Sequence, residues 1–260
     1  MADMKNDASL KLDLLENAID SIAHGLEHYV RGKENPTSYK FAILHLAQGV
    51  ELILKERLRR EHWVLIYEKV DKPDTSRTIG FDTAVQRLQS ICNVVLLKYI
   101  DTLKKLKETR NDIEHYKVSL SEKEAAVLIG ANIPFLVEFL EDELNTTLKE
   151  HIKDEEIWQE LLDIKEVFFQ AITKAREELS SVLDHKEKDQ IFPMVIECPV
   201  CGLDFLVIDS KGDKKSECLL CKHVSELREC IRCYTLFAVD ELFPTAMCAD
   251  CNSYLEQPNT

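Results

Sequence analysis

The chain of 260 residues lacks an excess of basic side chains, and it lacks any apolar run long enough to cross a bilayer. It carries 33 Lys and Arg residues against 47 Asp and Glu residues, which gives a formal net charge of −14 at pH 7. This balance excludes a protein that coats nucleic acid through general positive charge, so RNA would have to bind at a local patch or with a partner's help. The stretch from Met1 to Leu10 has no signal-peptide character. We therefore expect a cytoplasmic protein that does not associate with membranes.

Cysteine is nearly absent from the first 197 residues, where only Cys92 occurs. Disulfides are rare in the cytosol, so the eight later cysteines are better explained by metal binding. Two residues between cysteines let both thiolates of a tight turn reach one tetrahedral ion, and two such turns complete a four-sulfur site. All eight later cysteines fall into CxxC pairs, which are Cys198/Cys201, Cys218/Cys221, Cys230/Cys233 and Cys248/Cys251.

These four pairs predict two structural Zn²⁺ ions per chain in two tandem zinc ribbons. Because every thiolate then serves as a ligand, no open coordination position remains, and we expect no catalytic metal. Our prediction is sequential pairing, in which the first pair joins the second and the third joins the fourth. A cross-braced pairing of the first with the third also satisfies the spacing. Strand-like runs at residues 203–208 and 234–239 give this region β character.

Apolar residues recur at spacings of three and four through most of the first 187 residues, which indicates an all-helical region. We expect Asp82 to N-cap the third helix and Ser121 to cap the fifth in a capping box with Glu124. Pro134 should break or kink this fifth helix. The expected helices cover residues 8–31, 37–60, 82–91 and 94–115, then begin again at 121 and at 144, the last ending near 185.

The predicted fold class is mainly α, followed by a small β-rich part. We expect a helical domain at residues 1–150, a long connecting helix at 151–190 and the zinc-ribbon domain at 191–260. The last domain has six basic side chains against eleven acidic ones. A ribbon that binds a phosphate backbone is normally basic, so a protein is at least as plausible a partner for the ribbons as nucleic acid.

A second group of chemically useful residues lies near the end of the helix expected at 94–115. Cleaving RNA without metal requires proton transfer from the 2′-hydroxyl and to the 5′-oxygen, together with positive charge at the phosphorane. His115 suits the proton transfers, and Arg110 presents a fork of donors to phosphate oxygens. On a regular helix the two side chains lie about 140° apart. A working site therefore requires a frayed helix end, or a two-fold dimer that brings two such helices together.

An ordinary structural interpretation of the same residues is also available. Arg110 can form an ion pair with Glu114 four residues later, and Glu51 can do the same with Lys55. His115 then simply stands at a helix C-terminus, where its cationic form is favoured.

The sequence from Arg110 to His115 (RNDIEH) resembles the R-N-x-x-x-H signature of the HEPN superfamily, the all-helical domain of many bacterial and archaeal ribonucleases and toxins. Residues 41–55 resemble the second helix of such domains, and the similarity covers roughly residues 8–150. The resemblance implies a HEPN-like bundle of four or five helices and a homodimer formed through the motif helices. It also implies metal-independent endoribonuclease activity that leaves a 2′,3′-cyclic phosphate.

The resemblance assigns His115 as general acid or base, Arg110 as the residue that steadies the phosphate, and Asn111 as the residue that orients the site. We expect a homodimeric endoribonuclease acting on RNA, such as a toxin or defence effector, with zinc ribbons that dock an antitoxin or other protein, or that regulate the site. The alternative is a catalytically inactive adaptor that binds nucleic acid or protein. Residues in supporting positions are Glu51, Glu114 and Tyr116.

Overall fold

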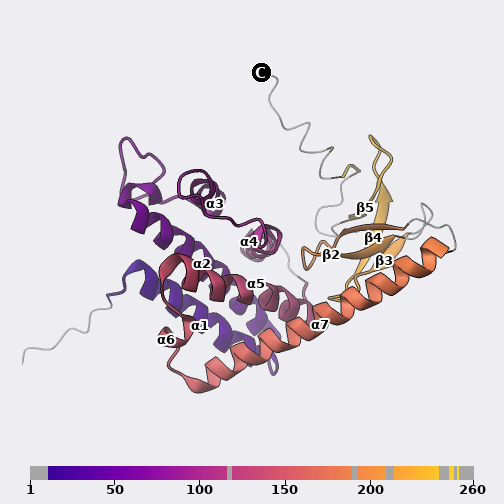
Figure 1. Cartoon of the computed structure of the whole chain (residues 1–260), viewed down its shortest axis with the longest axis horizontal. Helices are drawn as coiled ribbons and strands as arrows, with labels where there is room; N and C mark the ends of the chain where they lie inside the picture. Colours follow the sequence, from indigo (N-terminus) through magenta and orange to yellow (C-terminus); the bar gives the residue numbers. More distant parts are fainter. Residues whose placement is uncertain are drawn as a thin grey trace, which may run out of the picture.

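The computed structural model describes residues 11–115, 119–188, 193–208, 214–239, 246–248 and 251. Within these ranges the chain is mainly α, with a small β-rich part that follows the helices, as predicted (Figure 1). None of the described helices is both long and apolar enough to cross a membrane. The helices are α1 (Leu14–Gly32), α2 (Thr37–Glu61), the 3-10 helix η1 (Trp63–Ile66), α3 (Phe81–Ser90), α4 (Ile100–His115), α5 (Glu122–Leu144), α6 (Leu148–His151) and α7 (Glu155–Lys188).

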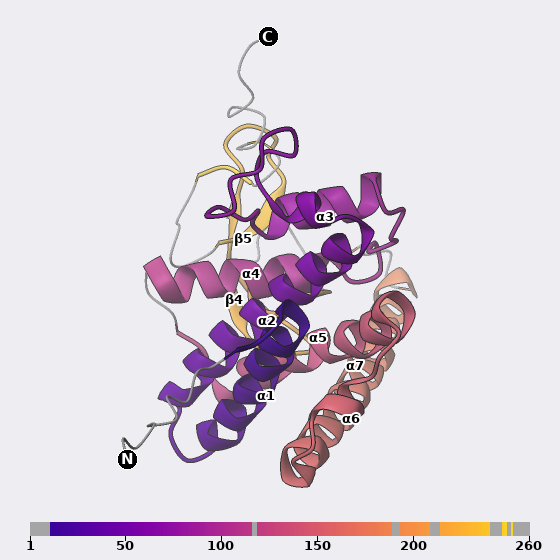
Figure 2. The same cartoon turned by 90° about the vertical axis from the view of Figure 1, so that its left-hand side faces the viewer.

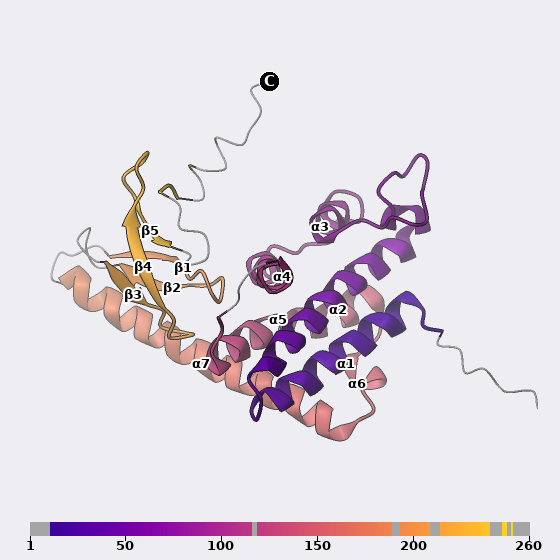
Figure 3. The ribbon, with the colours of Figure 1, turned by 180° about the vertical axis from the view of Figure 1, so that it is seen from behind.

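Helices α1 and α2 form an antiparallel pair that provides much of the helical core (Figure 3). Helix α1 begins with a capping box, in which the Asp13 carboxylate accepts from the Glu16 backbone N–H and the Glu16 carboxylate accepts from that of Asp13. At the crossing of the two helices, a Cβ at Gly49 would lie 2.5 Å from Ile22 Cγ1 and 3.0 Å from the Ala18 carbonyl oxygen. The absence of a side chain at Gly49 therefore sets how closely α1 and α2 approach.

Replacing Gly49 with alanine is expected to destabilise the protein by about 1–3 kcal/mol, because the new methyl group overlaps buried Ile22 and forces the helices apart. Chemical denaturation checks this value. Gly80→Ser is the matched control. Gly80 is the N-cap of α3 and has nothing within 4 Å of an added Cβ, and serine is a favoured N-cap residue. Equal stability of Gly49→Ala and the wild type would contradict this account of the crossing.

Two predicted helix starts are wrong. The N-cap of α3 is Gly80, not Asp82, because Phe81 already turns into the core as the first helical residue; Asp82 lies in the first turn. Helix α4 begins at Ile100 and not near residue 94. The preceding segment alternates between buried and exposed residues, with Leu96 at 2 % exposure and Leu97 at 74 %. This two-residue period is that of an extended chain.

Pro134 does not break α5, which runs unbroken from Glu122 to Leu144. A proline inside a helix costs about 3 kcal/mol. Its neighbours Ile133 and Phe135 are completely buried, and burial of each such side chain contributes about 1.5–3 kcal/mol, which offsets this cost. The helical pattern expected from residue 144 onward is divided, because Asn145 ends α5 in the left-handed conformation and α6 is a single turn before α7.

The β-rich part contains two small antiparallel sheets. Strand β1 (Met194–Glu197) pairs with β2 (Asp204–Ile208), and β4 (Val224–Glu229) lies between β3 (Lys215–Glu217) and β5 (Leu236–Val239). The two predicted strand-like runs correspond to β2 and β5. Helix α7 leaves the helical bundle and extends beneath these strands (Figures 1 and 3).

The helical and β-rich parts share a buried core. Val127 and Ala131 from α5 and Phe168 from α7 belong to the same apolar cluster as Phe205 and Leu206 of β2. The remaining core lies among α1 to α5, where α4 crosses α2 (Figure 2), and it also includes Leu148 of α6 and Leu161 and Ile164 of α7. The first ribbon, which contains Cys198 to Cys221, is therefore packed against α7 and against α5, the helix that follows the RNDIEH sequence.

Candidate functional site

The RNDIEH sequence occupies the last six residues of α4, and one face of the helix anchors it. Leu103 and Leu106 are fully buried and Ile113 is 7 % exposed. With these residues turned inward, Arg110 and Asn111 are partly buried at the edge of the core, whereas Glu114 and His115 are exposed.

Arg110 is held by two neighbours in its own helix. Its Nε lies 3.0 Å from Glu114 Oε2, and its Nη1 donates to Asn111 Oδ1 at 3.2 Å. The first contact is the i,i+4 ion pair of the ordinary interpretation. The arginine side chain is 39 % exposed and the glutamate side chain 35 % exposed, so this ion pair stabilises the fold by at most about 1 kcal/mol. A stronger anion can therefore replace Glu114 at little energetic cost.

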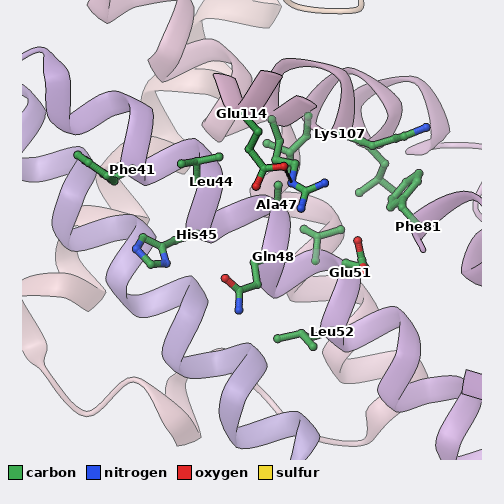
Figure 4. A pocket seen from close by; sticks show the side chains of 14 residues that line it. Phe41, Leu44, His45, Ala47, Gln48, Glu51, Leu52, Phe81, Lys107 and Glu114 are labelled. Atoms are coloured by element: carbon green, nitrogen blue, oxygen red, sulfur yellow. Dashed lines mark ion pairs between the residues drawn. The ribbon is translucent and has the colours of Figure 1, made fainter. Parts of the chain in front are cut away.

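Arg110 and Glu114 line a groove of about 470 Å³ between α2 and α4, with Phe81 of α3 also in its wall (Figure 4). Glu114 projects from α4 toward α2, and His45, Gln48 and Glu51 of α2 line the other side. The remaining lining residues are mostly apolar: Phe41, Leu44, Ala47, Val50, Leu52, Leu103, Leu106 and Lys107.

Glu51 forms the ordinary ion pair with Lys55 and also lies in the groove of the candidate site. Its Oε1 accepts from Lys55 Nζ at 2.6 Å, and Lys55 also donates to Thr78 Oγ1 at 3.2 Å. This is the expected i,i+4 ion pair, with an ammonium group that is almost completely buried. Because Glu51 also lines the groove, its carboxylate lies in the same cleft as Arg110.

His115 does not join this group. It is the exposed last residue of α4, and neither His115 nor Asn111 is among the residues that line the groove. Tyr116 lies outside the described residues. Of the residues predicted for the site, the structure thus brings together Arg110, Asn111, Glu114 and Glu51 within one chain, and it leaves His115 beyond the end of the groove.

His45 of α2 also lines the groove, although its sequence context did not mark it as a site residue. The His45 ring stacks on that of His28, with ring centroids 5.4 Å apart and an interplanar angle of 5°. Burial, followed by the nearby His24, lowers the pKa of His45, so its imidazole is neutral at pH 7. His45, Gln48 and Glu51 are three residues apart and so lie along one face of α2. This spacing was the sequence signal that could have pointed to His45.

The first cysteine cluster contains Cys198, Cys201, Cys218 and Cys221, all buried, with their sulfur atoms within 4.8 Å of one another. The grouping is the sequential one. Gly202 has φ +68°, a left-handed conformation that glycine adopts readily, and its N–H donates to the Cys198 carbonyl at 2.9 Å. Hydrogen bonds among the four sulfurs lower the pKa of Cys218 and raise that of Cys201, because the thiols are crowded around one point.

The second cluster contains Cys230, Cys233, Cys248 and Cys251, again within 4.8 Å. It is more open than the first, because Cys230 is buried but Cys233 is exposed. Tyr234 follows the knuckle with φ +59°, and its N–H donates to the Cys230 carbonyl at 2.9 Å. The Cys230–Cys233 turn therefore has the same backbone geometry as the Cys198–Cys201 turn but is more exposed to solvent.

Both clusters fit a metal ion, since four sulfur donors converge on one point in each. Such a site is closed, so the ion would stabilise the ribbon and not act on a substrate. The described residues thus provide two cysteine clusters that could each hold a metal ion and one groove that contains an arginine, a histidine and two carboxylates. Comparison of the chain with family models, curated proteins and solved structures finds no match.

Proposed function

We propose that this chain is a metal-independent endoribonuclease of the HEPN type, whose site is shared by two copies of the chain. The observation that carries the proposal is the separation of two residues in α4. Arg110 lines the α2–α4 groove, whereas His115 is exposed beyond it. A two-fold dimer that pairs the ends of two α4 helices supplies a second His115 beside each Arg110.

In this arrangement Arg110 binds the scissile phosphate. A guanidinium has five N–H donors, so the contacts through Nε and Nη1 leave others for phosphate oxygens. Asn111 holds the plane of the guanidinium through its Oδ1. The His115 of the second copy accepts the 2′-hydroxyl proton and then, as an imidazolium, donates a proton to the leaving 5′-oxygen, which gives a 2′,3′-cyclic phosphate and a 5′-hydroxyl end.

The charge of the chain limits how RNA is bound. Two cations line the groove, and each is partly neutralised, since Arg110 pairs with Glu114 and Lys107 Nζ lies 2.7 Å from Asp82 Oδ2. With a net charge of −14 over the whole chain, only a few phosphates can be neutralised. Binding of RNA therefore depends on local contacts or on a protein partner, such as an antitoxin bound through the ribbons.

Cleavage of a mixed RNA pool in EDTA tests the proposal. Wild-type protein is expected to give cyclic-phosphate ends, and His115→Ala is expected to be slower by about 10²–10⁴-fold, the usual contribution of general acid–base catalysis. His185→Ala, which removes an exposed histidine of α7, is the control and should behave as wild type. Equal cleavage by His115→Ala and wild type would contradict the assignment.

We further propose that both cysteine clusters hold Zn²⁺. Four thiolates suit zinc and iron equally in coordination number. The left-handed residues that follow three of the pairs, Gly202, Lys222 and Tyr234, favour the zinc knuckle. Elemental analysis of protein purified without added metal should give two zinc ions per chain. Iron at comparable content would contradict the proposal.

The Arg110–Glu114 ion pair favours the second candidate, an inactive adaptor that binds nucleic acid or protein. In an adaptor, Arg110 would serve mainly to stabilise the end of α4. Retained RNA or protein binding with no cleavage by wild type, Arg110→Ala or His115→Ala would select this alternative.

A further inference from the structure

The first ribbon contacts the helix that carries Arg110 and His115. Gly202, which follows Cys201 directly, lies against α4: an added Cβ would be 2.8 Å from Lys105 Cβ and 3.4 Å from the Asp101 carbonyl oxygen. Because Gly202 has φ +68°, both its backbone conformation and this close approach require glycine. The Cys198–Cys201 turn is therefore seated directly on α4.

The other half of the same cluster contacts the start of α5. His223, two residues after Cys221, has its Nδ1 2.7 Å from Glu124 Oε1. The second oxygen of that carboxylate, Oε2, accepts from the backbone N–H of Ser121 at 2.7 Å and so caps α5. Glu124 is only 9 % exposed. One buried carboxylate thus both begins α5 and holds the ribbon.

One contact lies in the first half of α4, at Asp101 and Lys105, and the other lies at the start of α5, after the connection between the two helices. Residues 116–121 separate His115, the last residue of α4, from Glu122, the first of α5. Gly202 follows one CxxC pair and His223 follows the other, and the two pairs form a single four-sulfur cluster. A metal ion bound by this cluster fixes the distance between the two turns, and with it the relation of α4 to the start of α5.

We propose that the first cysteine cluster positions the Arg110/His115 site, with Gly202 transmitting its state to the first half of α4 and His223 transmitting it to the start of α5. His223 and Glu124 are positioning residues, since they act through the helix ends. The expected effect of the first cluster on RNA cleavage rests on the proposed function. The contacts that join the cluster to α4 and α5 do not. The second cluster supplies neither contact, so the two clusters have different roles: one organises the site, and the other organises the outer ribbon.

The test compares full-length wild type, His223→Ala and Lys222→Ala. Lys222→Ala is the matched control, because it removes only exposed ion pairs, with Glu178 at 3.4 Å and Glu217 at 3.9 Å, in the same turn. Amide hydrogen exchange is followed in the last turn of α4 and the first turns of α5, and the metal content of each preparation is measured. We expect exchange about tenfold faster in His223→Ala, with two metal ions retained, and wild-type exchange in Lys222→Ala.

Wild-type exchange in metal-loaded His223→Ala would overturn the proposal. Glu124→Gln provides a second variant on the helical side, away from the ligands. Glutamine keeps the capping box with Ser121 but loses the charge that faces His223, and faster exchange at both helix ends is again expected.

If wild type cleaves RNA, His223→Ala should lower kcat about tenfold with KM unchanged, because misplacement of catalytic groups slows the chemical step. Unchanged kcat alongside faster exchange would refute the positioning role. If wild type does not cleave, the proposed function fails, and the exchange result still decides the link between the cluster and the helix ends.

Discussion

Replacing Cys218 with serine is expected to release one metal ion per chain and to unfold the first ribbon. A structural zinc site contributes on the order of 10 kcal/mol of folding free energy, comparable with the whole stability of a domain. Cys218 is completely buried, and its cluster lies in the same core as Val127 of α5 and Phe168 of α7. Unfolding of the ribbon would expose these helix surfaces, so we also expect the helices to melt about 10 °C lower.

Two controls separate this effect from general cysteine loss. Cys92→Ser changes a half-buried cysteine outside both clusters and should keep two metal ions and a nearly unchanged melting temperature. Cys233→Ser opens the exposed second cluster and should release one ion while the helices melt as in wild type. Metal analysis combined with thermal unfolding followed at 222 nm distinguishes the three proteins. A Cys218→Ser protein that keeps both ions would contradict the assignment of the first cluster.

Replacing Arg110 with alanine is expected to lower kcat/KM for RNA cleavage by about 10²–10³-fold, the usual effect of removing one preorganised donor to a developing negative charge. Arg110→Lys keeps the charge but loses the planar fork, so we expect only partial recovery, still about tenfold below wild type. The fold should barely change, because the ion pair with Glu114 is partly exposed. Initial rates over a range of RNA concentrations measure the effect.

Glu114→Gln also tests the role of Arg110, because it should strengthen the binding of phosphate to Arg110. The Glu114 carboxylate forms an ion pair with Arg110 Nε and competes with phosphate for it. Removing this charge should lower KM for RNA, or leave it unchanged, while kcat persists. If Arg110→Ala retains kcat/KM within about threefold of wild type, Arg110 does not bind the reacting phosphate.

Local signals in the sequence predicted much of the fold. The spacing of apolar residues identified the helical region, and Ser121 caps α5 with Glu124 as its pattern indicated. The CxxC spacing identified both metal clusters, because a ligand pair is a local feature of one turn. Their grouping was left open by spacing, since it depends on how β2, β3 and β4 bring separate turns together.

The failures occurred where tertiary contacts decide the local structure. Pro134 predicted a break, but burial of Ile133 and Phe135 keeps α5 continuous. The segment before Ile100 carries enough apolar residues for a helix, yet burial of Val94 and Leu96 on one side favours an extended path. Propensity is a weak signal beside such packing.

The candidate site was only partly accessible from the sequence. The positions of Arg110, Glu114 and His115 followed from helical geometry. The groove depends on how α4 crosses α2, and local patterns do not encode that crossing. For the same reason His45 could not be placed beside these residues, although the sequence located it on the same helix as Glu51.

The measurement that tests the shared site most directly is cleavage of RNA in EDTA by a mixture of Arg110→Ala and His115→Ala proteins. Each variant alone lacks one half of the chemistry in both copies and should be nearly inactive. A mixed dimer contains one Arg110 and one His115, so mixing after subunit exchange should restore cleavage with cyclic-phosphate ends. If mixed dimers form and remain as inactive as the separate variants, the site does not combine residues from two copies, and the account is wrong.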